Sequence, residues 1–97
     1  AAGAFVGHVH LHVGDLLRSV AFYRDALALE EHMVMPSVGM ADLSAGGRFP
    51  HRLALNVWHG PGVKQPPPGV AGLRHFELLV PDGEALDAVH ARPMPHV

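Results

Sequence analysis

The most constraining feature of the chain is a short pattern that occurs twice, 67 positions apart. His8 opens one strand-like segment and His75 opens another. Asp15 and Asp82 follow at the same offset, each just before a run of apolar residues at helical spacing. Each copy therefore predicts a strand that passes through an acidic turn into a helix. A repeated unit of this kind limits the fold to architectures built from similar halves.

The first copy predicts a complete βαβββ unit over residues 5–58. In its first strand, Val9, Leu11 and Val13 fall on one face and three histidines on the other, because successive strand residues alternate between faces. Asp15 can cap the following helix, whose apolar stripe should cover the sheet face opposite the histidines. The predicted elements are a strand over 5–13, a helix over 15–27, and strands over 30–35, 40–45 and 52–58.

The second copy is shorter. Residues 59–72 hold four glycines and four prolines, which is typical of an extended connector. The start of a second unit follows over residues 73–92, with a strand over 73–80 and a helix over 82–91 that Pro93 ends. The sequence thus predicts one domain over residues 1–97 with an incomplete second unit. Because its strand edge would be unpaired, we expect a homo-oligomer.

Composition excludes several classes of function. Cysteine is absent, so disulfides, thiolate metal sites and cysteine nucleophiles are excluded. The net charge of −2 offers no basic field for nucleic acid. No apolar run approaches the roughly 20 residues of a membrane-spanning helix. We therefore expect a cytoplasmic protein that binds neither nucleic acid nor membranes, and any metal must be held by nitrogen and oxygen atoms.

With these motifs in view, the chain resembles the vicinal oxygen chelate superfamily, which includes glyoxalase I, bleomycin-resistance proteins and extradiol dioxygenases. The resemblance is carried by residues 7–16 (GHVHLHVGDL) and 19–27 (SVAFYRDAL). Residues 53–58 (LALNVW) and 72–78 (GLRHFEL) look most like the first domain of catechol 2,3-dioxygenase-type members. This implies an α+β fold in which βαβββ units form a curved mixed sheet around a cleft. Ala28 stands where the family commonly has glycine, and a non-glycine residue is tolerated there at modest strain if the backbone stays out of the left-handed region.

The resemblance also implies a metal on the open face of the sheet. His8 matches the first-strand ligand of the first unit, and His75 matches its counterpart in the second. Asn56 lies near the last-strand position, where the family often has a glutamate, and the last-strand carboxylate of the second unit has no residue here. The implied cofactor is a divalent metal, with Fe(II) favoured and Mn, Zn or Ni as alternatives. Glu77, which shares a strand face with His75, is a candidate general base.

The remaining histidines receive a simpler interpretation. His10 and His12 share the face of His8, and we interpret them as polar lining of the cleft. His51 and His59 flank the last predicted strand of the first unit and are interpreted as loop residues at the cleft rim.

Two functions of different classes follow. The first is a metal-dependent enzyme that acts on a small molecule with adjacent oxygens, such as a catechol cleaved by an extradiol dioxygenase, or a glyoxalase-type lyase. The second is a non-catalytic ligand-binding module of the bleomycin-resistance type, or a non-catalytic N-terminal domain of a longer dioxygenase. The asparagine at position 56 and the missing final strand favour the second. The metal content after purification without chelator would separate them.

Overall fold

The computed structural model describes residues 2–46 and 51–93, and within them the chain forms a small α+β domain. This architecture confirms the predicted fold class and the βαβββ order of the first unit. The elements are β1 (Val9–His12), α1 (Leu16–Leu27), β2 (Glu30–Met35), the short 3-10 helix η1 (Pro36–Val38), β3 (Met40–Ser44), β4 (Leu53–Asn56) and α2 (Gly83–His90).

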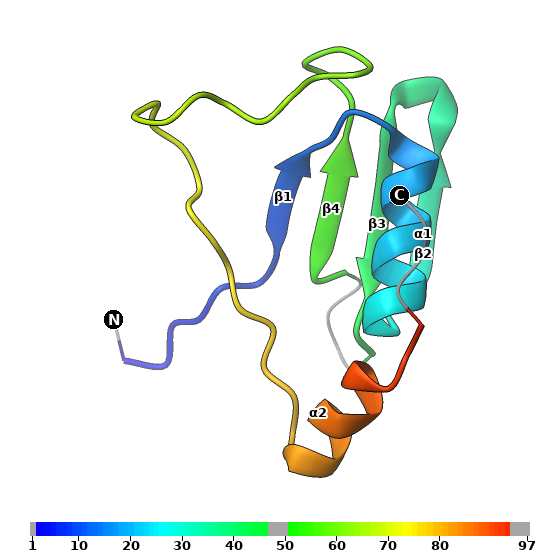
Figure 1. The fold of residues 1–97 in the computed structure, drawn as a ribbon, viewed down its shortest axis with the longest axis vertical. Coiled ribbons are helices and arrows are strands. Elements are labelled where there is room, and N and C mark those ends of the chain that lie inside the picture. Colours follow the sequence, from blue (N-terminus) through cyan, green and yellow to red (C-terminus); the bar gives the residue numbers. More distant parts are fainter. Residues whose placement is uncertain (1, 47–50, 94–97) are drawn as a thin grey trace.

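The strands form one mixed sheet in the order β1-β4-β3-β2 (Figure 1). β1 runs parallel to β4, whereas β3 is antiparallel to both of its neighbours. The register places Leu11 beside Leu55 on one row, and His10, Ala54 and Asp42 together on an adjacent row. Because adjacent rows face opposite sides of a sheet, the leucines and the polar residues separate as the alternation predicts.

The apolar face of the sheet is covered by α1 (Figure 1). As predicted, Asp15 caps this helix, since its carboxylate accepts a hydrogen bond from the Arg18 backbone N–H. Each buried leucine contributes roughly 1.5–3 kcal/mol by leaving water, so this small cluster is the main source of stability. The core consists of Leu16, Val20, Leu29, Ala41, Leu43, Leu53 and Leu55.

The end of α1 does not meet the condition for a low-strain alanine. Ala28 adopts φ 59° and ψ 27°, a left-handed conformation. The Leu29 N–H donates to the Tyr23 carbonyl at 3.4 Å, and the turn brings Leu29 into the core at 7% exposure. The burial of Leu29 therefore imposes a conformation that alanine disfavours.

The second unit is confirmed only in its helix. Asp82 accepts a hydrogen bond from the Ala85 N–H and caps α2. Residues 73–80, predicted as a strand, join no sheet in the described part of the chain and are mostly exposed. Phe76 alone among them packs against the core, at its margin. A segment with alternating residue types forms a strand only when a neighbouring strand satisfies its backbone N–H and C=O groups. Residues 73–80 have no such partner strand among the described residues.

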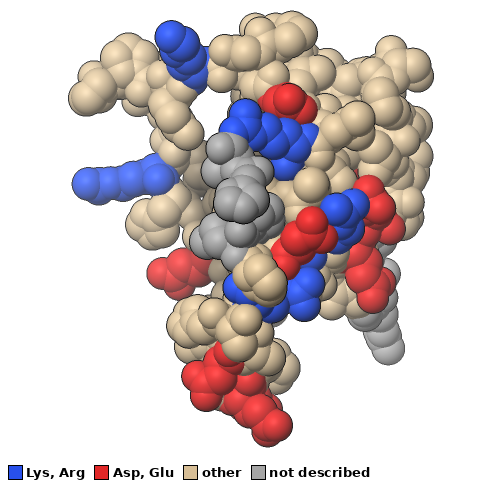
Figure 2. Space-filling view, turned by 45° about the vertical axis from the view of Figure 1, so that its right-hand side comes forward, with Lys and Arg blue, Asp and Glu red and all other residues tan. Residues whose placement is uncertain are grey.

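The surface charge is mixed. The face in Figure 2 carries basic and acidic side chains next to one another, with acidic atoms at its lower end. Within residues 2–46 and 51–93, neither helix has the length and apolar character needed to cross a membrane.

Candidate functional site

The sheet face opposite α1 carries two groups of polar side chains. Both lie on strands of the first unit, and each is built around one buried residue that is 3% exposed or less, Asp42 or Asn56. The strand register places these two residues on the same side of the sheet, because Asp42 pairs with Ala54 and Asn56 lies two positions further along β4.

The first group is a hydrogen-bonded network around the Asn56 amide. Its oxygen accepts from the Trp58 backbone N–H at 3.0 Å, which fixes the orientation of the amide. The same oxygen accepts from His12 Nδ1 at 2.8 Å, and the amide nitrogen donates to His10 Nε2 at 2.7 Å. His10 therefore accepts at Nε2 and has its proton on Nδ1 when neutral.

The electrostatics of this network favour a neutral His10. Burial lowers the pKa of His10 below its usual 6.5, and the nearby imidazoles of His12, His8 and His51 lower it further. A proton on Nε2 would also remove the acceptor that the Asn56 amide uses.

Flat rings surround the network. The Trp58 ring lies 5.5 Å from that of His10, and the His59 ring stacks on His12 with centroids 3.7 Å apart. Trp58 is held in place by its Nε1–H, which donates to the Val38 carbonyl at 2.8 Å. These rings form a flat aromatic border beside the polar residues.

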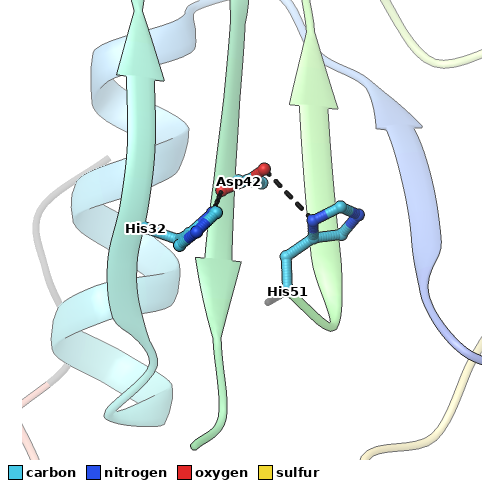
Figure 3. A group of neighbouring side chains, drawn as sticks. All are labelled: His32, Asp42 and His51. Atoms are coloured by element: carbon cyan, nitrogen blue, oxygen red, sulfur yellow. Dashed lines mark hydrogen bonds and ion pairs between the residues drawn. The ribbon is translucent and has the colours of Figure 1, made fainter. Parts of the chain in front are cut away.

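The second group joins His32 of β2, Asp42 of β3 and His51 just before β4 (Figure 3). His32 Nδ1 lies 2.7 Å from Asp42 Oδ1, and His51 Nδ1 lies 3.1 Å from Asp42 Oδ2. One potential ligand atom from each residue lies within 4.8 Å of the others. Two imidazoles and one carboxylate are the donor set of non-haem iron sites with open positions, so this group could hold a divalent metal.

A β-bulge positions this group. Between β2 and β3, Glu31 pairs with Leu43 and Met33 pairs with Asp42, so His32 is the extra residue. The bulge lets Asp42 Oδ1 accept from the Met33 N–H at 2.9 Å while it also contacts the His32 ring. Bulges redirect side chains in this way and are frequent beside functional sites.

Of the residues implied by the family resemblance, His8 and Asn56 lie in or beside these groups, whereas His75 is exposed in the segment that joins no sheet among the described residues. His8 precedes β1, is exposed, and packs edge-on against His51 with ring centroids 4.5 Å apart. Glu77 and His8 line a hollow of about 420 Å³ that His75 does not line. Asn56 already accepts two hydrogen bonds at its oxygen, which metal ligation there would disturb. The ligand roles of His8, His75 and Asn56, and the general-base role of Glu77, remain predictions.

The sequence interpretation missed two residues of the second group. His32 and Asp42 were not singled out, and His51 was taken as a rim residue, whereas its side chain is 22% exposed and faces a buried carboxylate. The available signal was Asp42 itself, because a carboxylate between apolar residues in a buried strand must have a partner.

Comparisons with known proteins give one informative similarity. The chain is 39% identical over 89 residues to catechol-2,3-dioxygenase of Bacillus subtilis (strain 168), a match that covers 90% of this chain and 30% of that protein. This similarity concerns one part of a dioxygenase. No protein-family model matches it, and no solved structure does either. Because the chain spans about 30% of the relative's length, the activity and substrate of the whole relative enter below as proposals.

Proposed function

We propose that this chain is a dioxygenase-like domain of the vicinal oxygen chelate type, which acts with a divalent metal on a small molecule that has two adjacent oxygens. A catechol opened by extradiol cleavage is the favoured substrate. The single observation that carries the proposal is the 39% identity to a catechol-2,3-dioxygenase over nearly the whole chain. The βαβββ sheet with one polar, histidine-bearing face agrees with it.

The residues of the open face fit this chemistry. Neutral imidazoles and a carboxylate are donors for Fe(II), with Mn, Zn and Ni as alternatives. When bound, the metal would supply Lewis acidity and orient the two substrate oxygens. The chain itself supplies the flat border formed by Trp58 and His59, against which an aromatic ring can stack. Glu77, beside His8 in the adjacent hollow, is the proposed proton acceptor.

A binding module without catalysis is the second candidate. The observation that favours it is the completeness of the Asn56 network, in which the amide satisfies His10, His12 and the Trp58 backbone without a metal. Such a network can form a rigid floor for a flat ligand. A non-catalytic domain of a longer dioxygenase would show the same behaviour.

One experiment separates the two candidates. The full chain is purified without chelator, its metal content is measured by mass spectrometry, and it is reconstituted with Fe(II) under anaerobic conditions. The proposal expects near-stoichiometric metal, together with oxygen uptake and appearance of a ring-fission product when catechol and air are added. Catechol binding by calorimetry without oxygen uptake would support the binding module instead.

Variants test the implied residues in the same assay. If His8 and His75 are ligands, His8→Ala and His75→Ala each lose metal, whereas His90→Ala on α2 retains it. Glu77→Gln should keep the metal and lose turnover if Glu77 moves the proton.

A further inference from the structure

We infer that His32, Asp42 and His51 form a divalent-cation site on the open face of the sheet. This assignment names a ligand set different from His8 and His75, and it rests on the proposed function for the expectation that a divalent metal is used at all. The argument itself depends on the distances, burial and local backbone of these three residues.

The distances are close to those of a coordination sphere. Two donor atoms about 2.1 Å from one ion, at about 90–109° to each other, lie about 3.0–3.4 Å apart. His51 Nδ1 and Asp42 Oδ2 are 3.1 Å apart and meet this condition as they stand. His32 Nδ1 is 2.7 Å from Asp42 Oδ1, so its ring would rotate slightly away from the carboxylate to admit an ion.

The burial of Asp42 calls for a cation. Its side chain is 4% exposed, and an ionised carboxylate out of water is costly unless its charge is compensated. A divalent cation held by Asp42 and the two imidazoles would compensate this charge.

His51 adds an independent observation. Its Nδ1 is shielded from solvent and makes no hydrogen bond among the described residues, although it lies near Asp42 Oδ2. A shielded nitrogen without a hydrogen-bond partner is costly, and ligation of a cation would satisfy its lone pair. The His8 ring packs edge-on against His51 with ring centroids 4.5 Å apart, which limits rotation of the His51 ring.

The backbone bulge in β2 positions His32, the third residue of the group, beside Asp42. His32 is the bulged residue between Glu31 and Met33, and the Met33 N–H donates to Asp42 Oδ1 at 2.9 Å. Asp42 is therefore oriented by its neighbour's backbone, as a ligating carboxylate is oriented by outer hydrogen bonds. The His32 side chain is 40% exposed, which leaves a path for the ion from solvent.

The donor set defines the class of ion. Two imidazole nitrogens and one carboxylate oxygen suit Zn²⁺, Fe²⁺, Co²⁺, Ni²⁺ or Mn²⁺, whereas Ca²⁺ and Mg²⁺ prefer oxygen ligands. Three protein ligands leave positions open, so the site can also take an exogenous ligand. We expect Zn²⁺ and Co²⁺ to bind and Ca²⁺ not to compete.

The test is calorimetric titration of the full chain with Zn²⁺, and spectroscopic titration with Co²⁺ under the same conditions. Asp42→Asn and His51→Asn should weaken binding more than about 100-fold, since loss of even an outer hydrogen-bond partner costs metal sites about 10- to 100-fold. The matched control is His12→Asn, which removes an imidazole from the same sheet face but leaves the Asp42 group untouched. Circular dichroism shows whether each variant is folded.

A measurement on the unmodified chain covers the case in which a variant does not fold. Imidazole resonances of His32 and His51 should shift when Zn²⁺ is added, and those of His12 should remain in place. The inference is overturned if Zn²⁺ shifts His8 and His75 instead, if the two variants bind Zn²⁺ as tightly as the parent, or if the parent does not bind it. Zn²⁺ binding at His8 and His75 would leave the proposed function intact. Binding at His32 and His51 without any catechol turnover would instead contradict the proposed function and leave the cation site standing.

Discussion

Replacement of Ala28 by glycine should stabilise the protein, because this alanine has φ 59° at the end of α1. A left-handed conformation costs a residue with a Cβ about 1–2 kcal/mol. Glycine avoids this cost but loses more backbone freedom on folding, which offsets about 0.4–1 kcal/mol. Ala28 is exposed, so removal of its methyl group sacrifices little buried area. We expect a net gain of about 0.5–1 kcal/mol in the free energy of unfolding.

The assay is thermal and urea unfolding followed by circular dichroism. For a domain of this size, the expected gain raises the melting temperature by about 2–8 °C. The matched control is Ala91→Gly, because Ala91 caps α2 in the same way but has φ −79°, where glycine offers no relief. We expect Ala91→Gly to leave stability unchanged or to lower it. An Ala28→Gly variant that is no more stable than the parent would refute the strain argument.

Three further predictions follow from the network, the core and the sheet edge. The pKa of His10 in the folded chain lies below 6.5, so as the pH falls His10 is protonated in the unfolded chain before it is protonated in the folded chain. The free energy of unfolding should therefore decrease as the pH falls from about 6.5 to the folded pKa of His10. Asn56→Asp replaces the donor facing His10 with a carboxylate, and the NMR titration of His10 should then move to higher pH. Leu55→Ala should cost about 2–5 kcal/mol because Leu55 is 0% exposed, whereas Leu86→Ala, at 44% exposure, should cost far less in the same unfolding assay. The chain should sediment above its monomer mass of 10.3 kDa, since β1 is an edge strand of the sheet in the described part of the chain and apolar residues of 73–80 are exposed; a single species of monomer mass at micromolar concentration would contradict this.

The first unit could be predicted from local patterns because each of its signals is local. Alternation in β1 separates Leu11 from His10 and His12, and Asp15 marks the start of α1. The bounds of β2 agree with the prediction, those of β3 and β4 differ by one or two residues at the ends, and β1 begins four residues later than predicted. Strand ends depend on ladder hydrogen bonds to neighbours, which no single segment specifies.

The features that escaped prediction depend on contacts between distant segments. Residues 73–80 have a strand-like composition, but a strand requires a paired neighbour. Ala28 is left-handed because Leu29 is drawn into the core. The group around Asp42 requires a one-residue register shift between β2 and β3. The alternation of residue types in β2 does not reveal this shift, so it does not predict that His32 lies beside Asp42.

The two polar groups are neighbours on the same face of the sheet. His10, Ala54 and Asp42 occupy one row of the sheet, and Asn56 lies two residues beyond Ala54 on β4, about 7 Å along the strand. Ala54 is itself only 1% exposed, so the surrounding side chains already cover the space between the two groups. The His32 side chain is 40% exposed, so a ligand of an ion beside Asp42 would approach from the β2 side of the sheet rather than across Ala54.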